Sequence, residues 1–211
     1  MRTQEQVNEI VRLLMEEYPL ADCTLDWNKA YELLFSVRLA AQCTDERVNK
    51  ITPALFARFP TLEAFAEADV AEVEEYVRSC GFYHSKARDI VACANVLLEK
   101  YGGELPHTME ELTALPGVGR KTANLILGDV FKVPGSTVVD THCIRISNLL
   151  GLVDDLKDPV KIEMELRKIL PPEHSSDFCH CIVLHGRAVC IARRPECERC
   201  CVRHLCRHYS G

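Results

Sequence analysis

Lys121 is the residue whose surroundings most clearly allow nucleophilic chemistry. It follows the run Leu115–Arg120 (LPGVGR), which connects a helical segment ending at Leu115 to another that begins near Arg120. A helix N-terminus and a neighbouring cation both disfavour the ammonium form of a lysine, and the neutral amine is a nucleophile for Schiff-base formation. A lysine in this position is also a common phosphate contact, so both roles stay open until a partner is found.

The two glycines in that connection, Gly117 and Gly119, indicate a helix-hairpin-helix. Glycine tolerates positive φ and lets a phosphate approach the backbone, while the second helix presents free N–H groups at its positive end. Spacing excludes a nucleotide-binding P-loop, because that motif requires a glycine directly before the lysine, where this chain has Arg120. A tight turn between helices that binds no ligand is the alternative interpretation.

Asp140 is the candidate partner of the lysine. The run Val138–His142 (VVDTH) carries this carboxylate from an extended apolar segment to the start of a helix. An aspartate at that point either caps the helix by accepting backbone N–H bonds or acts in catalysis. The two roles are compatible, so the sequence leaves both open.

Four cysteines close together indicate a metal centre. They are Cys190, Cys197, Cys200 and Cys206, separated by six, two and five residues. Structural zinc sites usually have two short Cys-x2–4-Cys pairs, whereas this run has one such pair. The wide spacings on either side of it favour an iron–sulfur cluster, and zinc remains the alternative. Cys201, directly after a candidate ligand, is interpreted as a bystander.

Helical periodicity extends over almost the whole chain. After Lys86, for example, apolar residues recur at steps of three and four until Gly102 and Gly103 end the segment. Residues 136–140 alone form an extended pattern, so we predict an all-α fold of ten or eleven helices without internal repeats. The predicted helices span residues 4–17, 28–41, 45–58, 62–68, 70–80, 86–101, 108–115, 121–131, 141–150, 159–169 and 176–190.

Composition and charge set the outer limits. The chain has 211 residues, is 47% hydrophobic and 27% charged, and carries a net charge of −6, which suits a globular protein with a sizeable core. The polar N-terminus resembles no signal peptide and no apolar run is long enough to span a membrane, so we expect a cytoplasmic protein with reduced thiols. The acids gather in residues 61–80 and the arginines in residues 187–207, which predicts one acidic face and one basic face.

Three signatures follow one another along the chain. They are the hairpin at Leu115–Ala123, the run Val139–His142, and Leu184–Arg187 (LHGR) with the four-cysteine loop after it. Two further segments accompany them, Ala41–Asp45 (AQCTD) and Gly81–Ala87 (GFYHSKA). Together they resemble bacterial endonuclease III, a family of DNA base-excision glycosylases and abasic-site lyases, over nearly the whole chain.

This resemblance implies a fold of two helical domains with a DNA-binding groove between them. One is a six-helix barrel with the hairpin, at residues 22–132, and the other is a cluster domain made of residues 1–21 and 133–211. The implied cofactor is a 4Fe-4S cluster on the four cysteines named above. The implied partner is double-stranded DNA that contains oxidised pyrimidines or abasic sites. The resemblance further implies a monomer that does not bind membranes.

The resemblance also implies roles in catalysis and DNA binding. Lys121 would attack C1′ of a flipped nucleotide and cut the strand 3′ to the lesion by β-elimination, while Asp140 stabilises positive charge on the sugar. Gln42 would fill the gap left by the flipped base. Phe82 stands at the wedge position where a leucine is common; an aromatic ring there still unstacks bases, and core packing is the competing interpretation. The other implied DNA contacts are Gly117, Gly119, Arg120, His142, Arg193 and Arg194.

Two other functions share part of this pattern. Adenine-mismatch glycosylases share the hairpin, the aspartate and the cluster, but generally have another residue at the position of Lys121 and a glutamate where this chain has Val37. The second alternative is a non-catalytic DNA-binding iron–sulfur module, which the presence of both Lys121 and Asp140 disfavours.

Overall fold

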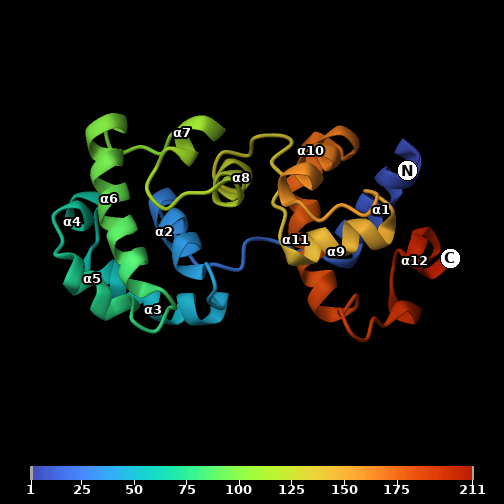
Figure 1. Cartoon of the computed structure of the whole chain (residues 1–211), viewed down its shortest axis with the longest axis horizontal. Helices are drawn as coiled ribbons and strands as arrows, with labels where there is room; N and C mark the ends of the chain where they lie inside the picture. The colour runs from blue at the N-terminus through green and yellow to red at the C-terminus, as the bar shows by residue number, and fades with distance from the viewer. Residues whose placement is uncertain (1, 211) are drawn as a thin grey trace. The chain divides into compact units, whose positions relative to one another are not determined.

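Helices and short connections make up the whole of the described structure, a computed structural model that covers residues 2–210 (Figure 1). These residues form twelve α-helices and three short 3-10 helices and no strand, which confirms the predicted all-α fold. The predicted bounds are met at α1 (Gln4–Glu17), α3 (Asp45–Arg58), α9 (Thr141–Leu150) and α10 (Pro159–Ile169). Each of these four helices has a Thr or Asp N-cap whose side chain accepts a backbone N–H bond.

The chain divides into two compact units, which are described separately. The hairpin unit comprises residues 24–131, and the cysteine unit comprises the residues up to 23 together with those from 132 onward. The sequence placed the corresponding boundaries at residues 22 and 132. No helix within residues 2–210 is long and apolar enough to cross a membrane.

The hairpin unit is organised around its longest helix, α6. This helix packs against α2, α4 and α5 (Figure 1). Three phenylalanines fill the space beneath them, since the ring centroid of Phe65 lies 5.1 Å from those of both Phe35 and Phe59. Besides α3, the helices of this unit are α2 (Ala30–Ala40), α4 (Leu62–Ala66), α5 (Val70–Val77), α6 (Tyr83–Tyr101), α7 (Met109–Thr113) and α8 (Arg120–Asp129).

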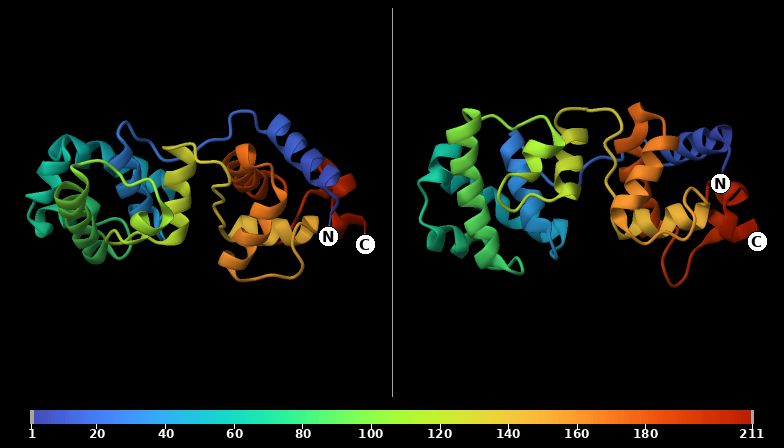
Figure 2. Two further views of the ribbon diagram at one scale, coloured as in Figure 1. Left: turned by 90° about the horizontal axis from the view of Figure 1, so that it is seen from above. Right: turned by 45° about the horizontal axis from the view of Figure 1, so that its top comes forward.

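The cysteine unit joins the two ends of the chain, and both termini lie in it (Figure 2). The first helix, α1, packs against α11, which also packs against α9. Val7, Ile10 and Leu14 of α1 are fully buried in the core that results. Besides α1, α9 and α10, the unit contains η1 (Pro172–His174), α11 (Ser175–Ala188), η2 (Cys197–Arg199), η3 (Arg203–Leu205) and α12 (Arg207–Ser210).

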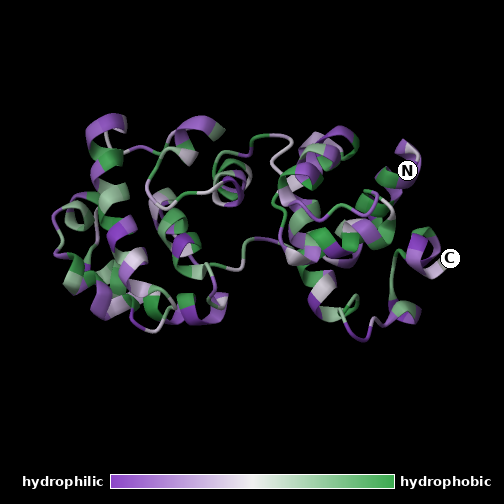
Figure 3. Ribbon diagram, in the orientation of Figure 1, coloured by the Kyte–Doolittle hydropathy of each residue, from purple (hydrophilic) through white to green (hydrophobic). Residues whose placement is uncertain are grey.

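Hydrophobic and hydrophilic residues alternate along the helices of both units, as amphipathic helices require (Figure 3). Residues 136–140, predicted to be extended, have no regular secondary structure and lead directly into α9. Most of the candidate functional residues therefore lie at helix starts and in connecting loops. The hydrophobic cores of the two units hold these helices and loops in place.

Candidate active site and metal centre

Gly117 fixes the path of the hairpin between α7 and α8. Its φ of +73° lies in the left-handed region, and a Cβ at this position would come within 2.8 Å of Arg38 Nε and Asp89 Oδ2. Arg38 and Asp89 form an ion pair, with Nη2 2.6 Å from Oδ2. The hairpin therefore rests on a charged pair from α2 and α6, and both the backbone angle and the close approach require glycine.

Gly119 differs, because nothing in its surroundings requires glycine. A Cβ there would have no atom within 4 Å, and its φ of −98° is open to any residue. Gly119 is the exposed N-cap of α8 and has no side chain to cap the helix. The first amides of α8 lie at the positive end of the helix dipole, an arrangement that suits a phosphate.

Lys121 lies in the first turn of α8 and is exposed. The adjacent Arg120 is half-buried. The Lys121 side chain is free to reach a ligand that lies on the amides behind Gly119.

Asp140 is the N-cap of α9, as one of its two predicted roles required. Its Oδ1 accepts a hydrogen bond of 2.8 Å from the backbone N–H of Cys143. The side chain is half-buried, and the bond to Oδ1 leaves the second carboxylate oxygen, Oδ2, for another partner. A carboxylate held in this way has a fixed orientation, which is useful to a catalytic group.

His142 connects the start of α9 to the cysteine loop. A Cβ at Gly186 would lie 2.3 Å from His142 Nδ1, so the imidazole occupies the space above this glycine. The same nitrogen is 3.3 Å from Arg145 Nη2. Arg145 in turn donates through Nη1 to the carbonyl of Cys190 at 2.6 Å. A continuous set of contacts therefore runs from the VDTH motif to the first cysteine of the loop.

Gln42 and Phe82 share an unusual backbone conformation. Both are non-glycine residues in the left-handed region, with φ of 55° and 59°, and both side chains are exposed. Phe82 is 69% exposed, so the competing interpretation of core packing is wrong. Such conformations cost about 1–3 kcal/mol each and are found where function requires a side chain to project from a fixed backbone.

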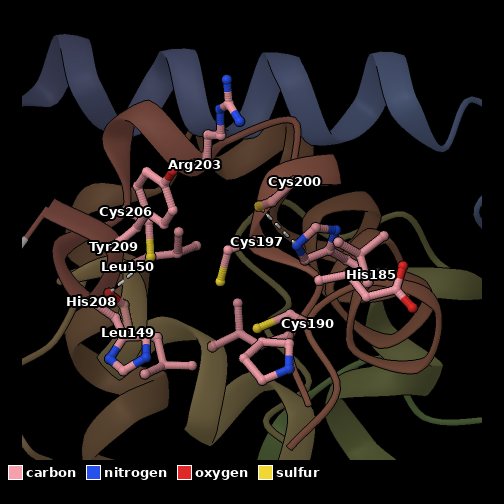
Figure 4. Close-up of a pocket in the computed structure, with 14 residues that line it drawn as sticks. Leu149, Leu150, His185, Cys190, Cys197, Cys200, Arg203, Cys206, His208 and Tyr209 are labelled. Atoms are coloured by element: carbon pink, nitrogen blue, oxygen red, sulfur yellow. Dashed lines mark hydrogen bonds between the residues drawn. The ribbon is translucent and has the colours of Figure 1, made fainter.

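The four cysteines of the candidate metal centre line one pocket of about 420 Å³ (Figure 4). Their sulfur atoms surround the same space, whereas Cys201 does not line it. Four thiols around one space can hold a single bound group, and this set of donors suits either an iron–sulfur cluster or zinc.

Nitrogen atoms lie within hydrogen-bond distance of two of these sulfurs. Arg145 Nη1 lies 3.5 Å from Cys190 Sγ, and His185 Nε2 lies 3.4 Å from Cys200 Sγ. The other ring nitrogen of His185 is 3.0 Å from the hydroxyl of Tyr18. Burial raises the pKa of Cys190, and raises that of Cys200 to about 12. Thiolates in such a site need a bound cation, which is what a metal cluster provides.

The sequence analysis assigned no role to Arg145, His185 or Tyr18. The spacing of Arg145 three residues after His142 places the two on one face of α9 and is the only local signal for it. His185 belongs to the LHGR motif, but its contact with Cys200 depends on the path of the loop. Cys201 packs near Glu17, and burial raises the pKa of its thiol to about 11.

Arg193 and Arg194 project from the loop between Cys190 and Cys197. Both are exposed, and within the described residues neither forms an ion pair. Three arginines that follow are paired with Glu196, Glu198 and Asp154: Arg199, Arg203 and Arg207. Fewer arginines of the predicted basic face are therefore available to bind phosphates than the sequence alone indicates, and Arg193 and Arg194 are among them.

Comparison with known proteins bears on the whole of this arrangement. Residues 35–172 match the HhH-GPD superfamily of base excision DNA repair proteins. This chain belongs to that superfamily. The match includes the hairpin, Lys121 and Asp140 and ends before the cysteine loop.

Full-length relatives place this HhH-GPD protein in the endonuclease III family. It is 45% identical to endonuclease III of Synechocystis over 96% of this chain and 92% of that protein. It is 40% identical to endonuclease III of Escherichia coli over 95% of this chain and 94% of that protein. The family consists of DNA glycosylases and abasic-site lyases of base excision repair, so the predicted enzyme class is confirmed.

Solved structures give the same answer for the HhH-GPD fold. A non-covalent endonuclease III–DNA complex is matched with a TM-score of 0.91 and 39% identity over 100% of this chain and 98% of that one. A thermostable thymine-DNA glycosylase is matched with a TM-score of 0.87 at 21% identity, which shows a shared fold.

Proposed function

We propose that this protein removes oxidised pyrimidines from duplex DNA and cuts the strand 3′ to the site, with Lys121 as the nucleophile. The observation that carries the proposal is the exposed side chain of Lys121 in the first turn of α8, next to the first backbone amides of that helix. Those amides would hold a phosphate of the damaged strand and so bring the amine near the adjoining sugar. The neutral amine of Lys121 is the attacking group.

The reaction follows from the chemistry of an amine at C1′. The nitrogen of Lys121 bonds to C1′ as the bond to the base breaks, and the base leaves with the bonding electrons and takes up a proton. Opening of the sugar ring gives a Schiff base. Loss of a proton from C2′ then expels the 3′ phosphate oxygen, which cuts the strand, and water releases the sugar fragment and restores the free amine.

Asp140 would stabilise the positive charge that develops on the sugar and assist the proton transfers. The capping bond from the Cys143 amide holds its carboxylate in place before the substrate arrives, so no reorganisation is needed during the reaction. Lys121 belongs to the hairpin unit and Asp140 to the cysteine unit. The proposal therefore requires that both units act on the same nucleotide.

DNA contacts in this proposal come from exposed groups. Gln42 and Phe82 would enter the duplex where the damaged nucleotide has left the stack, since their strained backbones already hold both side chains outward. Gly119, Arg120, Arg193 and Arg194 would contact phosphates, and His142 would lie near the same backbone. The protein would act as a monomer on chromosomal DNA in a bacterial cytoplasm.

The four cysteines would hold a 4Fe-4S cluster, whose chemistry here is to cross-link the loop that carries Arg193 and Arg194. The supporting observations are that the four cysteines line one pocket and that Arg145 and His185 lie beside two of the sulfurs. The chain itself contributes two cations on a loop of fixed shape. DNA binding then does not have to overcome the conformational entropy of ordering this loop.

The test is a panel of duplexes that carry thymine glycol, an abasic site or an adenine opposite guanine, with base release and strand cleavage scored separately. The proposal predicts release of thymine glycol with cleavage at the same site, and cleavage of the abasic duplex. Adenine release without cleavage would instead identify a monofunctional mismatch glycosylase. Binding without either reaction would identify a non-catalytic module.

A further inference from the structure

The loops that carry Gln42 and Phe82 lie against each other within the hairpin unit. A Cβ at Gly81 would lie 3.6 Å from the carbonyl oxygen of Gln42. Each loop also carries a cysteine next to its projecting residue: Cys43 follows Gln42, and Cys80 precedes Gly81. Neither cysteine belongs to the candidate metal centre, and nothing in the proposed reaction uses them.

The side chains of Cys43 and Cys80 lie close enough to interact, and the backbone of each residue is held in a turn. The N–H of Cys43 donates to Ala40 at 3.0 Å, and that of Cys80 donates to Val77 at 2.8 Å. Neighbouring thiols on two adjoining loops need only a modest approach to reach disulfide geometry.

The two cysteines differ in exposure, so they can play different parts in an oxidation reaction. Cys43 is half-buried and reachable from solvent, whereas Cys80 is fully buried. Burial and the neighbouring thiol of Cys43 raise the pKa of Cys80 to about 11, while the ammonium of Lys86 acts in the opposite direction. Lys86 is itself buried and donates to the carbonyl of Leu39 at 2.8 Å. A cation is thus fixed beside the place where a thiolate must form.

We propose that Cys43 and Cys80 are a disulfide-forming site that reacts with peroxide and ties the two loops together. The sulfur of Cys43 attacks one oxygen of hydrogen peroxide, the O–O bond breaks, and a sulfenic acid and water result. The sulfur of Cys80 then displaces the hydroxyl from this sulfenic acid, which leaves as a second water. Two thiols and one peroxide give one disulfide and two waters.

A second pair of cysteines provides an internal comparison. Cys143 and Cys179 also interact with each other, but both are buried, in the core of the cysteine unit. Peroxide can reach the first pair through Cys43 and has no such access to the second. A difference in oxidation between the two pairs therefore measures the role that exposure of Cys43 plays.

The consequence for DNA rests on the proposed function, because it assumes that Gln42 and Phe82 enter the duplex. A disulfide moves the backbones beside these residues and prevents the two loops from adjusting separately to the bases. Misplacement of positioning groups by about 1 Å costs up to roughly a hundredfold in rate. Oxidation should thus slow base release by about ten- to a hundredfold, and a thiol reductant should restore it.

The experiment treats the holoprotein with hydrogen peroxide, maps disulfides by peptide mass spectrometry, and measures thymine glycol release before and after reduction. Cys43→Ser is the matched variant, because it lacks the bond yet suffers any damage to the metal centre equally. A Cys43–Cys80 peptide with no Cys143–Cys179 peptide, and a reversible loss of activity absent from C43S, are expected.

Three results would overturn the inference. If no disulfide-linked Cys43–Cys80 peptide is found, the proposed site does not exist. If the buried pair is oxidised equally, exposure of Cys43 plays no role. If the disulfide form releases base at an unchanged rate, the disulfide does not act on the loops that carry Gln42 and Phe82. If the reduced protein releases no base from any duplex, the proposed function fails instead. In that case the disulfide map still shows whether Cys43 and Cys80 form a bond. Cys80→Ala is a second, independent variant in which this bond cannot form.

Discussion

His142 lies directly over Gly186, so that a Cβ on this glycine would come within 2.3 Å of His142 Nδ1. Neither ring movement nor backbone adjustment is easy there, because His142 also contacts Arg145 and a Cβ would lie 3.1 Å from Ile146 Cδ1. Gly186→Ala should destabilise the protein by about 1–3 kcal/mol, the usual cost of overpacking. Urea denaturation of the holoprotein measures this loss.

The double variant Gly186→Ala with His142→Ala provides the control for that prediction. Removal of the imidazole opens the space, so the double variant should be more stable than G186A alone, and the two changes should couple in a double-mutant cycle. Gly119→Ala is a second comparison, since no atom lies within 4 Å of its Cβ position. Stability of G186A equal to that of G119A would contradict the packing described.

Asp140 serves both as a helix cap and, in the proposed reaction, as a charge, and two substitutions separate these roles. Asparagine caps helices as well as aspartate, so Asp140→Asn should keep the stability but lose about 10²–10³-fold in base release, because the charge is gone. Asp140→Ala should lose that activity and also about 1 kcal/mol of stability. Thermal unfolding and single-turnover glycosylase assays measure both. Full activity in D140N would refute the electrostatic role.

Arg193 and Arg194 should supply phosphate contacts, because neither is held by a carboxylate within the described residues. Each phosphate contact contributes about 0.9 to the slope of log affinity against log salt. The double substitution of both by glutamine should therefore reduce this slope by about 2 on undamaged duplex. Arg207→Gln is the matched control, since Arg207 pairs with Asp154 and lies on α12. A slope that falls equally in both variants would contradict the assignment.

Cys197 and Cys201 should respond differently to serine substitution. Cys197 lines the pocket of the metal centre and Cys201 does not. Cys197→Ser should lose iron and the visible absorption of a 4Fe-4S protein, whereas Cys201→Ser should retain both. Iron and zinc content per chain, measured together with the spectrum, decides the matter. A colourless wild-type protein with one zinc would show that the cluster assignment is wrong.

The helix bounds that sequence predicts well are those set by local chemistry. Thr44 and Asp158 cap α3 and α10 with their own side chains, and both helices begin where the sequence places them. The start of α6 is different, because the helix begins at Tyr83 and the side chain of its N-cap residue makes no capping hydrogen bond. Phe82, in the left-handed conformation, precedes it. That conformation accompanies the contact between Gly81 and the distant Gln42, which local patterns do not contain.

The same division applies to the candidate site. Lys121, Asp140 and the four cysteines are visible in the sequence because each lies in a short motif whose spacing carries a chemical meaning. The groups that hold these residues in place cannot be identified from the sequence. Arg38 and Asp89, for example, meet beside Gly117 only because α2 packs on α6. His185 likewise reaches Cys200 only through the path of the loop. Motifs identify the candidate reacting groups, and tertiary contacts determine how firmly these groups are placed.

The central claim is that Lys121 forms a covalent bond with the sugar of the damaged nucleotide. Reduction with sodium borohydride during turnover on an abasic or thymine glycol duplex would convert the Schiff base to a stable amine link. The account predicts one adduct per chain, located at Lys121 by peptide mass spectrometry and absent from Lys121→Ala. An adduct at another lysine, or one that persists undiminished in K121A, would contradict it.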